Sequence, residues 1–278
     1  MPVRVVRADR VLTVIHSRAE VRNAVDPEHA QALYEAFLAF DADEAADVAV
    51  FWGEGGAFCA GADLKRLATR DQENPPRPSL EFPTDGGPVP RGPMGPTRLS
   101  LSKPVIAAIE GPAVAGGTEL ALWADCRVMA EGSYLGFYNR RWGVPLSDGG
   151  TVRLPRLVGQ GRALEIMMTG RRVEAEECLR IGLCERVAPK GGARQAAEEM
   201  AREIARFPQA CMRADRRSVY LQHGLSEYAA LEQEWNNCTG VFKLEGAAGA
   251  ARFAGGAGRH GDFSNLGEGK VVPRAEGG

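Results

Sequence analysis

The sequence predicts an α/β layered domain that is followed by a helical C-terminal region. Its 278 residues are 44% hydrophobic and 25% charged, which is typical of a chain with a sizeable buried core. Short apolar runs alternate with helical patterns as far as about residue 159, and beyond it the pattern is mainly helical. We therefore expect a core over 1–192, a helical region over 193–264 and a flexible tail over 265–278.

The expected strands are runs of β-branched or other apolar residues of the right length for buried strands. They are 11–15 (VLTVI), 48–53 (VAVFWG), 104–111 (PVIAAIEG), 126–130 (CRVMA) and 134–137 (YLGF).

The expected helices are recognised by a capping residue or by apolar residues at helical spacing. Asp26 precedes Pro27, which places a capping side chain before proline in a first turn. The stretch TELALWAD at 118–125 predicts a second helix. Two later helices are indicated by apolar stripes, Ala196, Ala197, Met200, Ala201 and Ile204 in one and Leu225, Tyr228, Leu231 and Trp235 in the other.

The segment 71–97 interrupts this pattern with eight prolines and no apolar period. We expect it to be a long surface loop. Loops of this length within a compact domain are usually either functional or disordered.

Composition argues against several classes of function. The formal net charge of −2 gives no general attraction to nucleic acid or to a membrane surface, and no segment approaches a membrane span. Six cysteines without a C-x-x-C spacing and four dispersed histidines give no metal-ligand pattern. We therefore expect a cytoplasmic protein with reduced thiols and without a metal, a nucleic-acid partner or a membrane anchor.

Two glycine-rich turns each follow an expected strand, at 53–64 (GEGGAFCAGADL) and at 110–120 (EGPAVAGGTEL). Glycine lets the backbone approach a ligand closely, and the first amides of a helix have no partner within the helix. One such turn is usually structural, whereas two in succession can direct two N–H donors at one oxygen, as stabilisation of an oxyanion requires. Glu119 follows the second glycine pair, either as an acid/base group or as a first-turn glutamate that the helix dipole favours.

The residues of these two turns resemble the signatures of the enoyl-CoA hydratase/isomerase, or crotonase, superfamily. The resemblance rests on AFCAGADL (57–64) and GPAVAGGTELALWADCRV (111–128), with further blocks as far as about residue 262. It implies a spiral of ββα units with a C-terminal helical region that forms a homotrimer, two of which commonly stack as a hexamer.

The resemblance also implies the site. Its ligand is an acyl-coenzyme A thioester, so coenzyme A arrives as part of the substrate and no cofactor is held permanently. The backbone N–H groups of Ala62 and Gly116 match the oxyanion donors, and Glu119 matches the first catalytic glutamate. The coenzyme A-binding positions are Arg22, Ala60, Asp63 and Leu64, although Arg22 also fits a plain surface charge. The segment 71–97 is expected to shape the acyl pocket.

One position departs from the pattern of the hydratases. Where they carry a second catalytic glutamate this chain has Asn139, and an amide can orient water but cannot shuttle a proton near neutral pH. Asp148 lies nearest in sequence as a replacement, and it equally fits a cap for the helix that follows Gly149 and Gly150.

The expected function is therefore that of an acyl-CoA-processing lyase of fatty acid metabolism, similar to an enoyl-CoA hydratase. The missing glutamate predicts weak hydration. Alternatives are isomerisation, thioester hydrolysis or decarboxylation by Glu119 or Asp148, and acyl-CoA binding without turnover.

Overall fold

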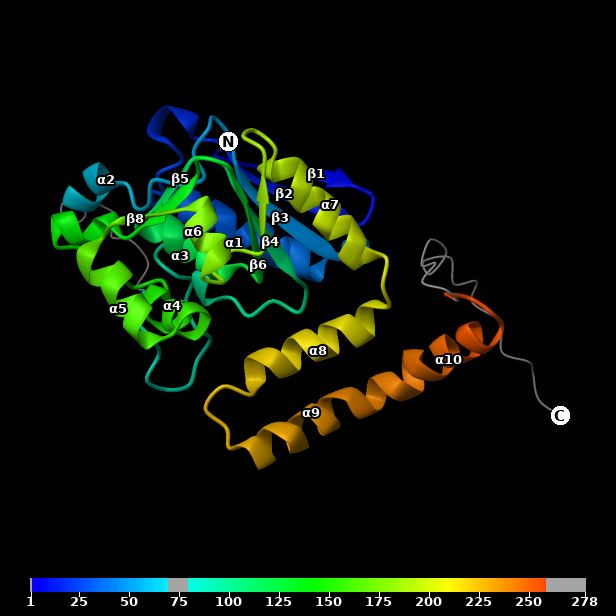
Figure 1. Ribbon diagram of the computed structural model, residues 1–278. Helices are drawn as coiled ribbons and strands as arrows, with labels where there is room; N and C mark the ends of the chain where they lie inside the picture. Colours follow the sequence, from blue (N-terminus) through cyan, green and yellow to red (C-terminus); the bar gives the residue numbers. More distant parts are fainter. Residues whose placement is uncertain (1, 70–79, 259–278) are drawn as a thin grey trace. The chain divides into compact units, whose positions relative to one another are not determined.

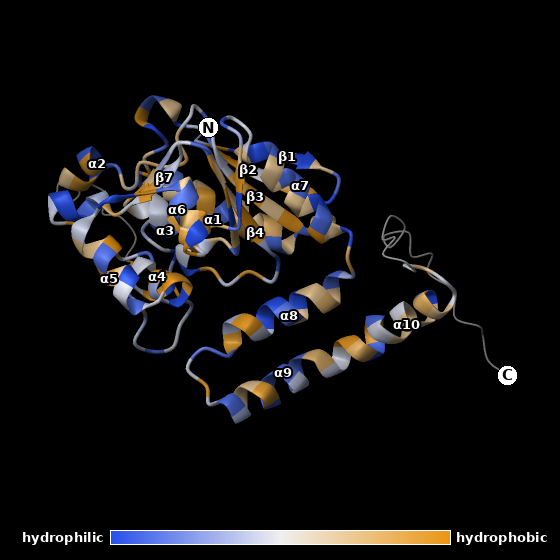
Figure 2. Ribbon diagram, in the orientation of Figure 1, coloured by the Kyte–Doolittle hydropathy of each residue, from blue (hydrophilic) through white to orange (hydrophobic). Residues whose placement is uncertain are grey.

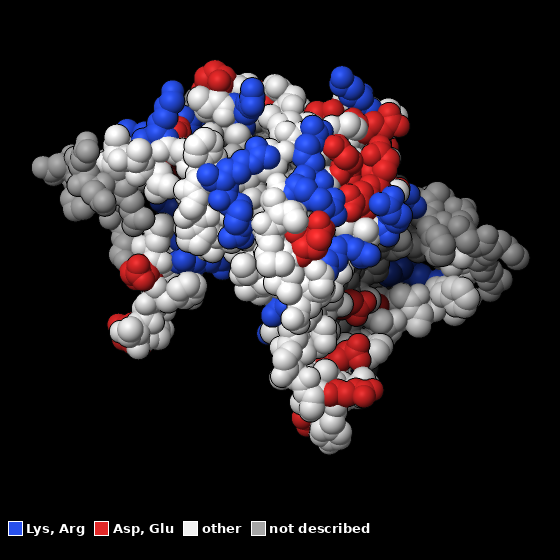
Figure 3. Space-filling view, turned by 60° about the vertical axis from the view of Figure 1, so that its left-hand side comes forward, with Lys and Arg blue, Asp and Glu red and all other residues white. Residues whose placement is uncertain are grey.

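The computed structural model describes residues 2–69 and 80–258, and these fall into two compact units that divide between Arg202 and Glu203. The predicted tail at 265–278 and residues 71–79 of the proline-rich segment lie outside the described residues. No helix of the described residues has both the length and the hydropathy needed to cross a bilayer. On the face shown in Figure 3 both basic and acidic side chains occur, in keeping with the small net charge.

The first unit is built on a six-stranded sheet in the order β1-β2-β3-β4-β6-β9 (Figure 1). Within this sheet β1 and β2 pair antiparallel, and every later neighbour is parallel. The strands are β1 (Val3–Ala8), β2 (Val11–His16), β3 (Val48–Gly53), β4 (Val105–Ile109), β6 (Cys126–Ala130) and β9 (Arg186–Ala188).

The central strands are hydrophobic along their whole length because both faces of the sheet are covered. All five residues of β4 are buried, and in β3 only Trp52 is partly exposed. Figure 2 shows both strands in the hydrophobic colour. A continuous apolar run is the pattern expected for strands of a parallel sheet that is covered on both sides.

A second sheet contains three short strands, β5 (Pro112–Val114), β7 (Tyr134–Gly136) and β8 (Arg172–Glu174), and β5 leads directly into the helix α3 (Gly116–Trp123). Asp26 caps the first long helix by accepting a hydrogen bond from the backbone N–H of His29, as predicted. In the described part of this unit the α-helices besides α3 are α1 (Pro27–Ala42), which is the helix that Asp26 caps, α2 (Leu64–Ala68), α4 (Gly150–Val158), α5 (Gln160–Thr169), α6 (Ala175–Arg180) and α7 (Ala193–Ala205), which reaches into the second unit.

The end of the proline-rich segment is not a surface loop, and this part of the prediction was wrong. Residues 94–97 are buried, and a 3-10 helix, η3 (Pro96–Arg98), packs against both α1 and α3. The carboxylate of Asp148 draws this segment inward, because it accepts hydrogen bonds from the Met94 amide and the Thr97 hydroxyl.

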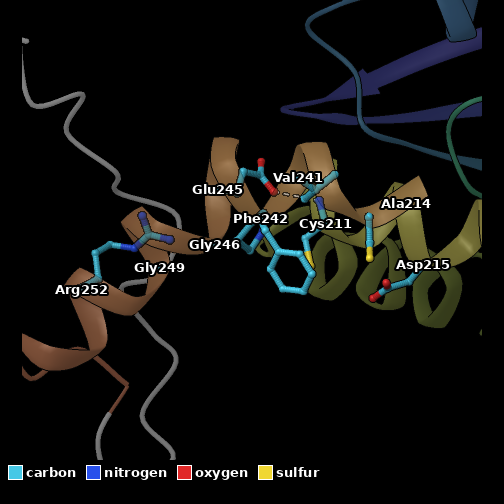
Figure 4. Close-up of a pocket in the computed structure, with 11 residues that line it drawn as sticks. Cys211, Ala214, Asp215, Val241, Phe242, Glu245, Gly246, Gly249 and Arg252 are labelled. Atoms are coloured by element: carbon cyan, nitrogen blue, oxygen red, sulfur yellow. Dashed lines mark hydrogen bonds between the residues drawn. The ribbon is translucent and has the colours of Figure 1, made fainter. Parts of the chain in front are cut away.

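The second unit is a helical hairpin of α8 (Gln209–Leu221) and α9 (Glu227–Val241), continued by a π-helical turn, η5 (Phe242–Gly246), and α10 (Ala247–Ala254). Glu245 in the π-helical turn accepts hydrogen bonds from the backbone N–H groups of Ala210 and Cys211, and so caps α8. Figure 4 shows Glu245 beside Cys211. Beside this cap lies a pocket of about 220 Å³ that includes Cys211 and Phe242 in its lining.

Candidate active site

The two glycine-rich turns meet at one end of the second sheet. Cys59 donates its backbone N–H to Pro112 O (3.2 Å) and accepts from the N–H of Val114 (2.9 Å), which joins the turns by a parallel bridge. Gly117 lies where they cross, and a Cβ there would stand 2.2 Å from the carbonyl oxygen of Cys59. The second glycine of the pair is therefore required for close approach.

The backbone amide of Ala62 points away from the neighbouring chain. Val25 donates to Gly61 O (2.8 Å) and accepts from the N–H of Asp63 (2.9 Å), so the parallel bridge uses the groups on either side of Ala62. In such a bridge the central residue turns its own N–H to the opposite side. Ala62 is exposed, so this donor can meet a ligand.

The amide of Gly116 is the second donor. Gly116 is the first residue of α3, so its N–H has no acceptor within the helix. The preceding Ala115 has φ 53° and ψ −123°, a conformation that costs about 1–3 kcal/mol in a residue other than glycine. It is held by a 2.7 Å hydrogen bond from its own N–H to Gly136 O, so the turn that presents Gly116 is strained and firmly anchored.

The two donors lie beside each other. Gly61 has φ +90°, and a Cβ on it would stand 3.2 Å from the nitrogen of Gly116 and 3.0 Å from the Cβ of Ala115. The peptide unit that joins Gly61 to Ala62 therefore lies against the start of α3. Two neighbouring N–H groups without intrahelical or bridge partners can hold one carbonyl oxygen and stabilise negative charge on it.

Glu119 lies one helical turn after Gly116 and is only 2% exposed. Its Oε1 accepts hydrogen bonds from the backbone N–H groups of Asp148 (2.9 Å) and Gly150 (2.8 Å). Burial raises the pKa of Glu119 to about 7, against the lowering effect of the Gly150 hydrogen bond, and the nearby Asp148 raises it further. A carboxyl group with this pKa can both take up and release a proton near neutral pH.

Asp148 is also buried, and its Oδ1 accepts from the Met94 amide (2.9 Å) and from the Thr97 hydroxyl. Burial raises its pKa, while these two hydrogen bonds oppose the rise. Asp148 does not cap α4, because Gly149 occupies the N-cap position and the N–H of Gly150, the first residue of α4, is accepted by the side chain of Glu119. The capping interpretation was therefore wrong, since the carboxylate turns toward residues 94–97 instead.

Asn139 lies in a 3-10 helix, η4 (Tyr138–Trp142), and is 6% exposed. Its Nδ2 donates to the carbonyl oxygen of Val144 (2.7 Å), while its Oδ1 is buried without a hydrogen-bond partner among the described residues. No hydrogen bond between described side chains links it to Glu119 or Asp148. The amide therefore fastens its own loop and leaves one buried acceptor unused.

The residues predicted to bind coenzyme A gather around the first turn. Ala60 donates its N–H to the carbonyl oxygen of Arg22 (2.9 Å), whose side chain is exposed. Asp63 caps α2 and lies 3.4 Å from the guanidinium of Arg18, and Leu64 follows it with 40% exposure. The structure thus brings these four positions together beside the exposed amide of Ala62.

The first turn also carries a cysteine, whose thiol is bound within the fold. The Cys59 thiol is fully buried, donates to Asn23 O (3.2 Å) and accepts from the Gly61 amide (3.3 Å), and burial raises its pKa to about 12. Within the part of the chain that the structure describes, no group of three or more His, Cys, Asp or Glu side chains could hold a metal ion.

Three residues near the site were missed from the sequence, namely Met94, Thr97 and Ala115. Ala115 gave no signal because alanine rarely takes a positive φ. Met94 and Thr97 belong to a segment whose prolines and glycines indicated only a loop.

The comparisons with known proteins identify the family. A sequence profile of the enoyl-CoA hydratase/isomerase family matches residues 7–254. The chain belongs to this family. It is similar to the enoyl-CoA hydratase EchA19 of Mycobacterium tuberculosis, with 34% identity over 77% of this chain and 78% of the relative. It is also 39% identical to the carnitinyl-CoA dehydratase of Salmonella typhi over 66% of each chain.

Solved structures of the same family confirm the crotonase fold. The crystal structure of enoyl-CoA hydratase EchA1 from Mycobacterium marinum matches with a TM-score of 0.81 and 32% identity. The match covers 91% of this chain and 96% of that one. Family membership and fold together support an acyl-CoA-processing, hydratase-like enzyme.

Proposed function

We propose that this protein adds water across the double bond of a 2-enoyl-CoA, with Glu119 as the acid/base group and the amides of Ala62 and Gly116 as the oxyanion hole. The observation that carries this proposal is the position of Glu119, a buried carboxyl with a pKa of about 7, one helical turn from the amide of Gly116, beside which the amide of Ala62 lies. Acyl transfer and enolate chemistry both place charge on a carbonyl oxygen, and this arrangement stabilises that charge.

The proposed reaction has two steps. The thioester oxygen accepts hydrogen bonds from Ala62 and Gly116, which draws electrons away from the double bond. Glu119 takes a proton from water as the water oxygen bonds to C3, and the electron pair of the double bond moves into the thioester enolate. Glu119 then returns its proton to C2 as the enolate reverts to the thioester. Losing one oxyanion donor typically costs about 10²–10³ in rate.

One observation favours isomerisation as a second candidate. Asn139 supplies no titratable group, and its Nδ2 is bound to Val144 O. Moving a double bond from C3 to C2 requires only that one group remove a proton from C2 and return it to C4. Glu119 alone can do this, since its pKa lies near the operating pH.

The remaining contacts with substrate and partners are part of the same proposal. Arg22, Ala60, Asp63 and Leu64 lie beside the exposed end of the oxyanion hole, so we assign the coenzyme A moiety to that side.

A homotrimer, or a hexamer of two trimers, is supported by large apolar side chains that the second unit exposes. They include Tyr228 (78%), Leu231 (58%), Trp235 (62%) and Leu244 (71%). Light scattering at micromolar concentration should give the mass of three or six chains, and a monomer would contradict this assignment.

The proposal is tested by incubating the purified protein with crotonyl-CoA, with a 3-enoyl-CoA and with saturated acyl-CoAs, and identifying the products by mass. Hydration adds the mass of one water to crotonyl-CoA, whereas isomerisation of the 3-enoyl-CoA leaves its mass unchanged and creates a conjugated thioester that absorbs in the ultraviolet. Release of free coenzyme A from every substrate would instead identify a thioester hydrolase.

A further inference from the structure

Met94 lies directly against the proposed oxyanion donor Gly116, yet the chemistry above does not use it. A Cβ on Gly116 would stand 2.6 Å from the Met94 sulfur and 2.9 Å from its Cγ. The Met94 side chain is 1% exposed and belongs to the hydrophobic core cluster. The thioether therefore fills the space beside the first turn of α3.

The turn that carries Met94 is fastened to the residue that also holds Glu119. Asp148 binds Met94 N–H and the Thr97 hydroxyl through its side chain, and donates its own backbone N–H to Glu119. Arg153 adds two further hydrogen bonds, from Nη1 to Asp148 O (2.9 Å) and from Nη2 to Thr97 O (2.7 Å). Met94 and the acid/base group thus share one support.

The turn that carries Met94 also cannot move away from Gly116, because it packs closely against α1. Gly95 has φ +98°, and a Cβ on it would stand 2.6 Å from Ala30 O and 3.2 Å from the Cβ of Leu33. Both of those residues belong to α1 and are fully buried. Met94 is therefore held between α1 on one side and Gly116 on the other.

The exposure of the site fixes which side the acyl group takes. A thioester carbonyl bound by Ala62 and Gly116 carries the coenzyme A sulfur on one side and the acyl carbons on the other. Ala62 is exposed and Gly116 is buried, so the large polar coenzyme A leaves on the side of Ala62. The acyl carbons then point inward, toward Glu119 and the Met94 thioether.

We propose that Met94, held in place by Asp148 and Thr97, forms the inner wall of the acyl pocket and restricts the enzyme to short acyl groups. This inference rests on the proposed function, because it takes the thioester position from the oxyanion hole. In it Asp148 is a positioning residue, which acts through Met94 and Glu119 and does not touch the substrate. A thioether suits this wall, since it offers apolar contact without a polar atom that would need a partner.

The test compares 2-enoyl-CoAs of increasing length in the wild type, in Met94→Ala and in Met94→Leu. We expect Met94→Ala to raise the ratio of kcat/KM for 2-octenoyl-CoA to that for crotonyl-CoA by about 10-fold or more, because one methylene in such a pocket is worth at least about that factor. Met94→Leu keeps the volume and should leave the ratio near that of the wild type.

The matched control is Met129→Ala, which makes the same truncation at a fully buried methionine of β6. It should lower stability without changing the ratio.

Two variants of Asp148 separate positioning from catalysis. The side-chain oxygen of Asp148→Asn can still accept both hydrogen bonds, so the chain-length ratio should stay near that of the wild type. Its kcat should stay within about 10-fold of the wild type, whereas loss of a general acid/base would cost about 10²–10⁴. Asp148→Ala releases the turn and should shift the ratio in the same direction as Met94→Ala. A ratio that is unchanged in Met94→Ala, or a loss of about 10² or more in Asp148→Asn, overturns the inference.

Binding of two saturated acyl-CoAs, butyryl-CoA and octanoyl-CoA, is measured by calorimetry. It distinguishes failure of the inference about Met94 from failure of the proposed function. If the wild type binds acyl-CoAs without hydrating or isomerising any enoyl-CoA, the proposed function fails. The inference is then tested by the ratio of the dissociation constants of octanoyl-CoA and butyryl-CoA, compared between Met94→Ala and the wild type. An unchanged ratio overturns it. If no acyl-CoA binds, both are overturned.

Discussion

Replacing Glu119 by glutamine should remove turnover and at the same time stabilise the folded protein at alkaline pH. The pKa of Glu119 rises from 4.5 to about 7 on folding, chiefly because the carboxyl is buried. The folded chain therefore keeps a proton that the unfolded chain loses between these two values. The contribution of this group to the free energy of unfolding is full below about pH 4.5 and is lost as the pH rises through 7.

The size of the effect follows from the shift. Each pKa unit corresponds to about 1.4 kcal/mol. Ionisation of Glu119 therefore lowers the free energy of unfolding of the wild type by about 3 kcal/mol at about pH 8 and by less than about 1 kcal/mol at about pH 5. The glutamine side chain of Glu119→Gln cannot ionise, but its carbonyl oxygen can still accept from the amides of Asp148 and Gly150. The variant should thus exceed the wild type in stability by these amounts.

Urea unfolding at fixed protein concentration, at both pH values, measures the difference, and crotonyl-CoA hydration measures the activity. The control is Glu110→Gln, because the Glu110 carboxylate accepts the N–H of Gly191 in an exposed position. If the stability difference between Glu119→Gln and the wild type depends on pH no more than that of this control, the Glu119 carboxyl is not held at a raised pKa. Undiminished turnover in Glu119→Gln would remove its catalytic assignment.

Three further predictions concern Asn139, Gly117 and His29. Asn139→Glu should raise crotonyl-CoA hydration by about 10-fold or more by supplying a titratable group, while loss of the bond to Val144 O lowers stability by about 1 kcal/mol; unchanged hydration would contradict a role for this position. Gly117→Ala should abolish activity and lower the melting temperature, because its Cβ would meet a carbonyl oxygen at 2.2 Å; wild-type kinetics would refute the crossing of the two turns. Burial lowers the pKa of His29 to about 4 from 6.5, so the wild type should lose about 3 kcal/mol relative to His29→Gln as the pH falls from 6.5 to 4; parallel pH profiles of urea unfolding would show that His29 titrates normally.

The elements that the sequence predicted well are those with continuous apolar runs or a strong local signal. The strands around 48–53 and 104–111 and the helix after Asp26 are confirmed, since burial on both faces and a capping pair leave clear patterns. The edge strand β1 was missed because its residues are mostly exposed and give no apolar run. The three-residue strands β8 and β9 are too short to show a period.

The candidate site also contains both residues that could be predicted from the sequence and residues that could not. The glycine pair and Glu119 could be recognised because both turns carry residue types that their backbone requires. The partners of Asp148 could not be foreseen, since Met94 and Thr97 are more than fifty residues away in sequence and were drawn inward by the carboxylate itself. The strained conformation of Ala115 likewise depends on a hydrogen bond to a distant strand.

The hydrogen bonds to Glu119 have a consequence for the diversification of this scaffold. The N–H groups that orient the carboxylate, like the proposed oxyanion donors, belong to the main chain. Substitutions that preserve the backbone conformation therefore leave them in place, except at Gly150 and Gly116, where a Cβ would stand 3.0 Å from Oε1 of Glu119 and 2.6 Å from the Met94 sulfur. Mutations at the surrounding positions are free to reshape substrate preference while the reactive groups keep their geometry. In the proposed site, this division between main-chain donors and a lining of side chains would let single substitutions change the acyl specificity.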